Sequence, residues 1–156
     1  SIYGFFCLAN KSYFTYISIK AFLWSKYLEW IDTLFLVLSG KPISMLQYTH
    51  HMSTAILVYY NFFPIISPFI GIFSILNCFV HVFMYWYFAY PKGFLYKYRH
   101  LITQSQIVQH IICLSTTIIV PFVNNCSQNF MGHLLGFLLY TMYLIYFIIF
   151  YLKKYN

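Results

Sequence analysis

The stretch Lys26-Tyr-Leu-Glu-Trp-Ile-Asp-Thr33 contains both acidic residues of the chain, Glu29 and Asp32. Residues three apart lie on one face of a helix, so Lys26, Glu29 and Asp32 form a charged stripe on a mostly apolar segment. In a bilayer such a stripe must face a protein interior or a wet cavity, which makes it a candidate site. A structural ion pair between helices explains the stripe equally well.

The composition indicates a polytopic membrane protein. Hydrophobic residues make up 62% of the 156 positions and charged residues only 7%, and a soluble domain of this size could not bury so much apolar surface. The net charge of +7 could suggest nucleic-acid binding. The basic residues instead lie in short clusters between apolar runs, where they act as orientation signals, so we expect membrane lipid and no nucleic acid as a partner. The four cysteines lack CxxC spacing and indicate neither a zinc site nor a disulfide framework.

Five apolar segments predict an all-α bundle of transmembrane helices that forms a single domain over residues 1–156. Each segment is close to the ~20 residues that cross the hydrocarbon core, and Gly or Pro residues separate most of them. Residues 1–20 are broken by Asn10, Lys11 and Lys20 and are interpreted as the end of an earlier span and a loop, in an N-terminally incomplete piece. The expected helices cover 22–39, 43–62, 68–90, 100–120 and 130–152.

The loop charges predict the orientation of the helices. Loops 61–67 and 123–129 contain no Lys or Arg, so the positive-inside rule places them on the lumenal side and the basic loops in the cytoplasm. Lys11, Lys20 and Lys26 are exceptions to this pattern. The basic positions assigned to the cytoplasm are Lys41, Lys92, Lys97, Arg99, Lys153 and Lys154.

Short motifs agree with this orientation. Asn10 and Asn125 each begin an Asn-X-Ser tripeptide on the predicted lumenal side, although such tripeptides are common by chance. Lys153 and Lys154 resemble the dilysine retrieval signal of endoplasmic reticulum membrane proteins, and a basic cap on the last helix explains them equally well. We therefore expect a multi-pass protein of the endoplasmic reticulum membrane.

Four consecutive predicted helices each place polar groups on one face. A lone histidine on an apolar face is more often a core residue, but four converging polar faces favour a functional cavity. Histidines, carboxylates and amides together can supply a nucleophile or base, its orienting partners and donors to a developing oxyanion. Besides the charged stripe, the polar positions are Gln47, His50, His51, Asn77, His81, Met84, Tyr85, Thr103, Gln106 and Gln109, with His110 and Cys113 continuing the last face.

Two other functions remain open at this point. A histidine-rich membrane site is compatible with a metal-dependent lipid desaturase or hydroxylase, but His100 and His133 lie at helix ends outside the constellation, which leaves few ligands. A transporter or a structural membrane protein could use the same polar faces for helix packing or as a substrate path.

The motifs resemble those of the ELO family of very-long-chain fatty acid elongases. Residues 25–33 are similar to its K-x-x-E-x-x-D-T box and residues 47–51 to its H-x-x-H-H box, with Gln47 in place of the first histidine. Residues 77–87 are similar to its N-x-x-x-H-x-x-M-Y box and residues 103–109 to its T-x-x-Q-x-x-Q box. All four occur in family order. The resemblance covers about residue 22 to the end, which matches spans three to seven of a seven-span bundle.

This resemblance implies a 3-ketoacyl-CoA synthase without a metal or other cofactor. A long-chain acyl-CoA would condense with malonyl-CoA, losing carbon dioxide and CoA, to give a 3-oxoacyl-CoA two carbons longer. The other enzymes of the elongation cycle, a ketoacyl reductase, a dehydratase and an enoyl reductase, are expected partners, as is a second copy of the chain.

The resemblance also implies roles for single residues. His50 would be the nucleophile that forms an acyl-imidazole, with His51 and His81 orienting groups or exchanging protons. Glu29 and Asp32 would fix the histidine rings. Gln47 can only form hydrogen bonds at its position. The expected substrate contacts are Asn77, Gln106 and Gln109 at carbonyl oxygens, Tyr85 and Thr103 from the same boxes, and Lys26 at the CoA phosphates.

Overall fold

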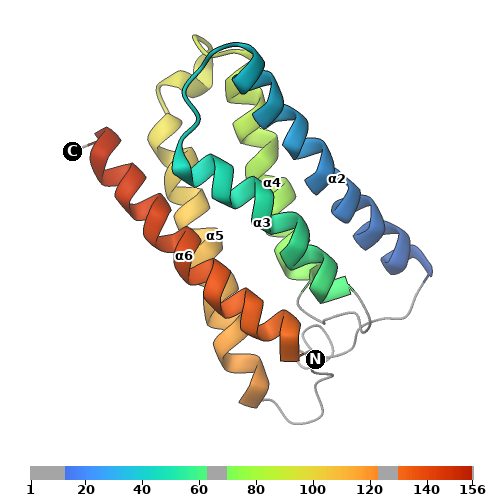
Figure 1. Cartoon of the computed structure of the whole chain (residues 1–156). Helices are drawn as coiled ribbons and strands as arrows, with labels where there is room; N and C mark the ends of the chain where they lie inside the picture. The colour runs from blue at the N-terminus through green and yellow to red at the C-terminus, as the bar shows by residue number, and fades with distance from the viewer. Residues whose placement is uncertain (1–12, 63–69, 123–129, 156) are drawn as a thin grey trace.

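The structure is a computed structural model that describes residues 13–62, 70–122 and 130–155. In these ranges the chain forms five long helices, two short 3-10 turns and no strand, which confirms the predicted all-α class (Figure 1). The elements are α2 Tyr13–Leu38, α3 Met45–Phe62, α4 Ile70–Ala89, η1 Phe94–Tyr96, α5 Arg99–Ile119, η2 Val120–Phe122 and α6 Phe130–Tyr155.

The predicted start of the first helix is wrong. α2 begins at Tyr13, and the expected loop before residue 22 is helical from that point onward. Lys20 does not interrupt the helix because its side chain is exposed while its neighbours Ile19 and Phe22 are buried in the core. The earlier part of the expected loop lies outside the described residues.

The end of α2 is set by a glycine. Gly40 has a φ of +64°, a conformation that is costly for residues with a Cβ atom. The N–H of Gly40 donates to the carbonyl of Val37 and the N–H of Lys41 donates to that of Leu36. This is the Schellman arrangement, and it satisfies carbonyls that the helix end would otherwise leave unpaired.

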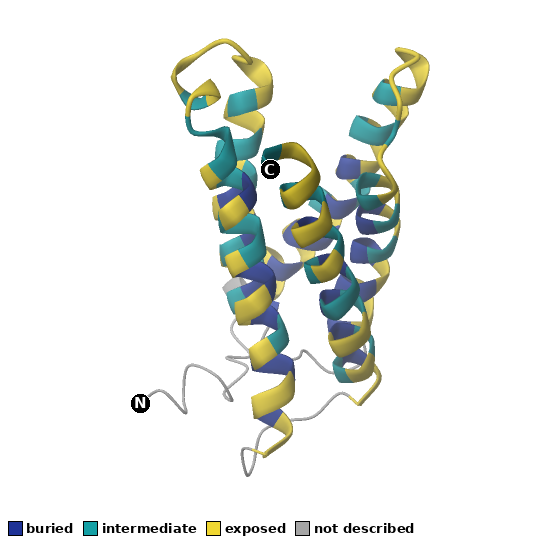
Figure 2. Cartoon of the chain, turned by 90° about the vertical axis from the view of Figure 1, so that its left-hand side faces the viewer, coloured by how far each residue is buried: buried dark blue, intermediate teal, exposed yellow. Residues whose placement is uncertain are grey.

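The five helices form a closed ring. Going round it, α2 packs against α3, α3 against α6, α6 against α5, α5 against α4, and α4 returns to α2. The buried residues line the inner faces of the helices and the exposed ones lie outside (Figure 2). The ring therefore surrounds two apolar clusters, one that α3, α4, α5 and α6 form and one that α2, α3 and α4 form.

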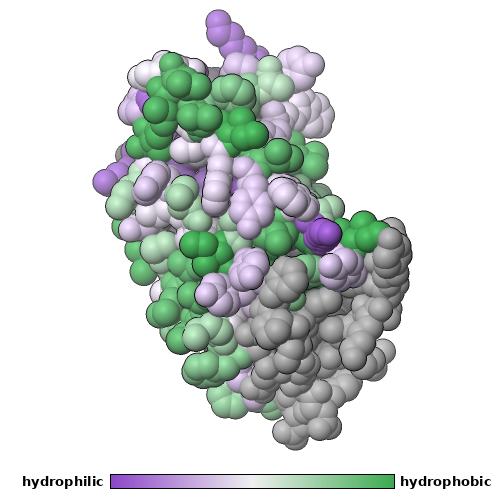
Figure 3. Space-filling model, turned by 45° about the vertical axis from the view of Figure 1, so that its right-hand side comes forward, coloured by the Kyte–Doolittle hydropathy of each residue, from purple (hydrophilic) through white to green (hydrophobic). Residues whose placement is uncertain are grey.

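The outside of the ring is apolar. Large side chains such as Leu34, Phe79, Ile118 and Phe137 are exposed, and strongly hydrophilic residues are scarce on the face shown in Figure 3. In the described part of the chain, three helical segments are long and apolar enough to cross a membrane, namely Ile70–Ala89, Arg99–Phe122 and Phe130–Tyr155. A multi-pass membrane protein is the arrangement that gives such a surface a suitable solvent.

The other two of the five predicted spans correspond to α2 and α3, and neither is apolar enough to be counted among these membrane-crossing segments. α2 carries four charged residues, Lys20, Lys26, Glu29 and Asp32. The polar first half of α3 lowers the mean hydropathy of that helix. Lys26 and Glu29 are buried in the ring, so much of this polarity faces protein rather than the outer surface.

The basic residues gather at one end of the bundle. The connection from α2 to α3, the connection from α4 to α5 and the C-terminal end of α6 lie together there (Figure 1). These segments contain all six basic positions that were assigned to the cytoplasmic side. The structure thus places them at a common end, and the side of the membrane that this end faces stays a prediction.

The contact between α5 and α6 is the most extensive in the ring. Gly136 of α6 is buried there, and a Cβ atom on it would lie 3.0 Å from the Cγ2 atom of Thr117. Small residues at helix contacts allow close approach in membranes, where packing rather than hydrophobicity drives association.

We expect Gly136→Leu to destabilise the protein by about 1–3 kcal/mol, because the added side chain must separate α5 from α6. Thermal unfolding in detergent measures this. Gly71→Leu is the matched control, since a Cβ atom at Gly71 meets no described atom within 4 Å. Equal melting temperatures for the two variants would contradict the close packing of α5 on α6.

Candidate functional site

A small cavity of about 30 Å³ lies inside the ring. Since one buried water needs roughly 10–15 Å³ of such volume, the cavity has room for about two waters. All five helices contribute to its wall. The polar and titratable residues that line it are Lys26, His50, Thr54, Asn61, Asn77, Gln109, His110, Cys113, Tyr140 and Tyr143.

The predicted stripe on α2 forms a buried ion pair. The Nζ atom of Lys26 lies 2.5 Å from Oε1 of Glu29 and donates to Oδ1 of Asn77, also at 2.5 Å. Lys26 is 2% exposed and Glu29 is 5% exposed. The ammonium also sits 4.7 Å from the centre of the Phe22 ring. Because the charge of Lys26 is enclosed and paired, the expectation that it contacts CoA phosphates is not supported.

The carboxylate of Glu29 also faces a histidine. Its Oε1 atom lies 3.4 Å from Nδ1 of His81 on α4. Its Oε2 atom is buried and has no hydrogen-bond partner among the described residues. Glu29 therefore lies between Lys26 and His81. This position is compatible with the predicted role of Glu29, which is to orient a histidine ring.

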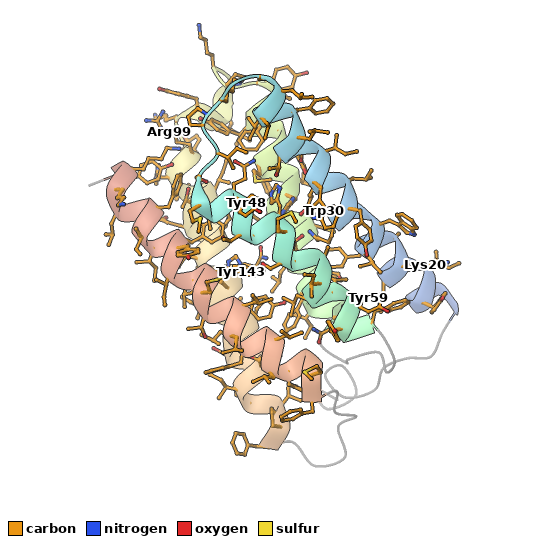
Figure 4. All side chains as sticks on the ribbon, in the orientation of Figure 1. Lys20, Trp30, Tyr48, Tyr59, Arg99 and Tyr143 are labelled. Atoms are coloured by element: carbon orange, nitrogen blue, oxygen red, sulfur yellow. The ribbon has the colours of Figure 1, made fainter. Side chains whose placement is uncertain are left out.

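His51 connects α3 to α2. Its Nδ1 atom lies 2.9 Å from the backbone oxygen of Glu29 and 2.9 Å from Oγ1 of Thr33. A carbonyl oxygen can only accept, so Nδ1 donates and Nε2 of the neutral ring remains an acceptor. The indole of Trp30 donates to the backbone oxygen of His51 at 2.7 Å, and Figure 4 shows Trp30 beside α3.

His50 lies on the cavity wall among aromatic rings. Its ring centre is 4.8 Å from that of Tyr143, 5.7 Å from His51 and 6.0 Å from His110. The Tyr143 hydroxyl is held 2.6 Å from Oγ of Ser53, and Figure 4 shows Tyr143 where α6 passes α3. His50 is 8% exposed, and within the described ranges its ring nitrogens make no hydrogen bond. A buried imidazole with uncommitted nitrogens can act as a nucleophile or base.

Asp32 and Tyr85 form a separate contact between α2 and α4. The hydroxyl of Tyr85 donates to Oδ2 of Asp32 at 2.6 Å. Tyr85 is 40% exposed, and neither residue lines the cavity. Asp32 contacts no histidine in the described part of the chain, so the expected contact of Asp32 with an imidazole is not made.

The predicted face of α5 is only partly turned to the cavity. Gln109 is buried and lines it, whereas Thr103 is buried outside it. The side-chain amide of Gln106 donates to Sδ of Met84 at 3.7 Å. Gln47 is half-buried on α3, and its side chain forms no hydrogen bond to a described residue.

Two residues of this site belong to none of the four family motifs. His110 and Tyr143 both line the cavity and both contact His50. The spacing predicts His110 on the polar face of its helix, because it comes four residues after Gln106. Nothing in the sequence distinguishes Tyr143 among the 17 tyrosines of the chain.

The chain matches the model of one protein family, GNS1/SUR4 or ELO, over residues 2–156. The chain belongs to the GNS1/SUR4 family. The elongase motifs predicted from the sequence are thus part of a similarity over nearly the whole chain.

Relatives in this family carry the name of fatty acid elongases. The long chain fatty acid elongase 1 of Caenorhabditis elegans is 34% identical over 86% of this chain and 49% of its own length. The fatty acid elongase A of Dictyostelium discoideum is 30% identical, covering 99% and 60%. The human very long chain fatty acid elongase 6 is 29% identical, covering 86% and 53%. The chain spans about half the length of the curated relatives it matches. No solved structure matches it.

The histidines of this GNS1/SUR4 chain are not grouped as metal ligands. Among the described residues, no three His, Cys, Asp or Glu side chains are placed to hold one ion. The donor set therefore does not favour the metal-dependent desaturase or hydroxylase.

Removal of one partner of the buried ion pair should be costly. We expect Lys26→Met to destabilise the protein by about 3–5 kcal/mol, because the Glu29 charge is left uncompensated in the ring. The double variant Lys26→Met/Glu29→Gln should lose less than Lys26→Met alone, since it leaves no buried charge at the pair. Thermal or chemical unfolding in detergent measures these two variants and the single variant Glu29→Gln. A double variant whose loss equals the sum of the Lys26→Met and Glu29→Gln losses would contradict the pairing.

Proposed function

We propose that this protein is a fatty acid elongase that condenses a long-chain acyl-CoA with malonyl-CoA to give a 3-oxoacyl-CoA. The observation that supports this most is His50, a buried imidazole with uncommitted nitrogens on the wall of the cavity inside the ring. Membership of the GNS1/SUR4 family and the names of its relatives agree with this activity.

In the first half of the proposed reaction, a nitrogen lone pair of His50 attacks the thioester carbon. The carbon–sulfur bond breaks, CoA leaves, and an acyl-imidazole remains on the protein. Neutral imidazole is suited to this step because it is both a nucleophile and a good leaving group for the next one. Burial also keeps water from hydrolysing the acylated ring.

In the second half, malonyl-CoA loses carbon dioxide and its carbanion attacks the acyl carbon of His50. The carbon–nitrogen bond breaks and the imidazole regains a proton. His81, against the Glu29 carboxylate, is a candidate to exchange protons in this half-reaction. Nδ1 of His51 already donates to the backbone oxygen of Glu29 on α2, so His51 is better suited to positioning than to proton exchange.

Two amides on the cavity wall suit the oxygens of the substrate. Asn77 accepts from Lys26 through Oδ1, which leaves its N–H groups free to donate. Gln109 of α5 also lines the cavity and makes no side-chain hydrogen bond to a described residue. Preorganised donors of this kind stabilise charge that develops on an oxygen in the transition state.

The setting of the proposed reaction is the endoplasmic reticulum membrane. The six basic residues at one end of the bundle are exposed or half-buried and could attract the phosphates of CoA there. The product would pass to a ketoacyl reductase, a dehydratase and an enoyl reductase, because a 3-oxo group must be removed before another cycle.

His50→Ala should abolish the formation of 3-oxoacyl-CoA. The assay supplies labelled malonyl-CoA and a series of acyl-CoA chains to membranes that contain the full-length protein. His100→Ala is the control, since His100 packs on Tyr155 away from the cavity, and it should keep wild-type activity. Full activity in His50→Ala would overturn the assignment of the nucleophile. An inactive wild type that transports acyl-CoA would favour a transporter.

A further inference from the structure

We propose that His110 is the proton carrier that serves His50 when the acyl-imidazole forms. The inference rests on the proposed function and adds a residue that none of the four sequence motifs contains. His110 is on α5, directly after Gln109, and it lines the same cavity as His50.

The position of His110 suits this role. Its ring centre is 6.0 Å from that of His50, and the two planes are inclined at 72°. This separation is within the range of about 4.5–7 Å for edge-to-face ring pairs, so the two imidazoles are in contact and a proton has only a short distance to cross between them. His110 is 2% exposed, so this contact is shielded from bulk water.

The hydrogen bond of His110 selects its tautomer. Nδ1 lies 2.6 Å from the backbone oxygen of Gln106, and that oxygen can only accept, so the proton of the neutral ring is on Nδ1. Nε2 therefore carries the lone pair. Within the described ranges Nε2 forms no hydrogen bond, which leaves it free to accept a proton.

The other side chains that could accept the proton of His50 are bonded elsewhere, do not line the cavity or cannot take up a proton. His51 does not line the cavity, and its Nδ1 is bonded to α2. His81 lies against Glu29. Gln47, which occupies the first position of the histidine box, has an amide that cannot take up a proton. Among the described imidazoles, His50 and His110 are the two that line the cavity.

The acylation step needs such a carrier. When a lone pair of His50 bonds to the thioester carbon, the ring becomes a cation that still holds its N–H proton. The carbon–sulfur bond breaks and its electron pair stays on sulfur. Nε2 of His110 accepts the proton from His50 and passes it to the thiolate, so that a neutral acyl-imidazole and CoA thiol result. General acid–base help of this kind typically contributes about 10²–10⁴-fold to a rate.

A packing role for the same ring must be distinguished from this chemistry. His110 stacks on Phe147 with ring centres 4.9 Å apart and planes at 30°, and its ring is also 5.6 Å from that of Tyr143. His110→Phe preserves an aromatic ring at this position and removes the nitrogens. His110→Asn removes the ring and keeps polar atoms.

The test measures CoA release from acyl-CoA in a single turnover without malonyl-CoA, on the full-length protein in detergent. We expect both variants to release CoA about 100-fold or more slowly than the wild type. His110→Phe should keep the wild-type melting temperature and the wild-type acyl-CoA concentration for half-maximal release, so that the loss falls on the maximal rate of CoA release. His100→Phe is the control, and its release rate should be unchanged.

Each other outcome overturns the inference. A wild-type rate in His110→Phe, with loss only in His110→Asn, would show that His110 is a packing residue. If His110→Phe needs more acyl-CoA for half-maximal release while its maximal release rate is unchanged, His110 shapes the substrate site. If the wild type releases no CoA and forms no 3-oxoacyl product, the proposed function fails and this inference fails with it.

Discussion

The buried pair of Lys26 and Glu29 is the constraint on which the rest of the bundle depends. Two charges cannot remain in a bilayer without compensation, because each costs several kcal/mol to remove from water. Asn77 and His81 of α4 supply further partners to the pair, and the backbone of Glu29 bonds to His51 of α3. The need to satisfy one ion pair thus fixes α2, α3 and α4 relative to one another.

The remaining two helices complete the enclosure with aromatic groups. α5 and α6 pack closely at Gly136, and they bring His110, Tyr140 and Tyr143 to the cavity. The ring contacts of His50 from these two helices are His110, Tyr143 and Phe147, and α2 and α4 add Lys26 and Asn77 to the wall of the same cavity.

The sequence predicted the parts of this arrangement that depend on spacing within one helix. Lys26 and Glu29 are three apart and do pair, and the histidine box does place His50 and His51 together. Contacts between distant residues were not predictable in this way. Lys26 with Asn77 and His50 with His110 depend on which helices become neighbours, and Asp32 turns out to bond to Tyr85 rather than to an imidazole. The start of α2 was not predictable from the position of Lys20, because a lysine whose side chain is exposed does not end a helix.

The central claim is that His50 carries the acyl group. The most direct measurement is peptide mass spectrometry of the full-length protein after it is mixed with acyl-CoA in the absence of malonyl-CoA and quenched rapidly. The account predicts the mass of one acyl chain on the peptide that contains His50, and loss of this label when malonyl-CoA is added before the quench. An acyl group on another residue, or elongation without any acylated form of the protein, would contradict the account.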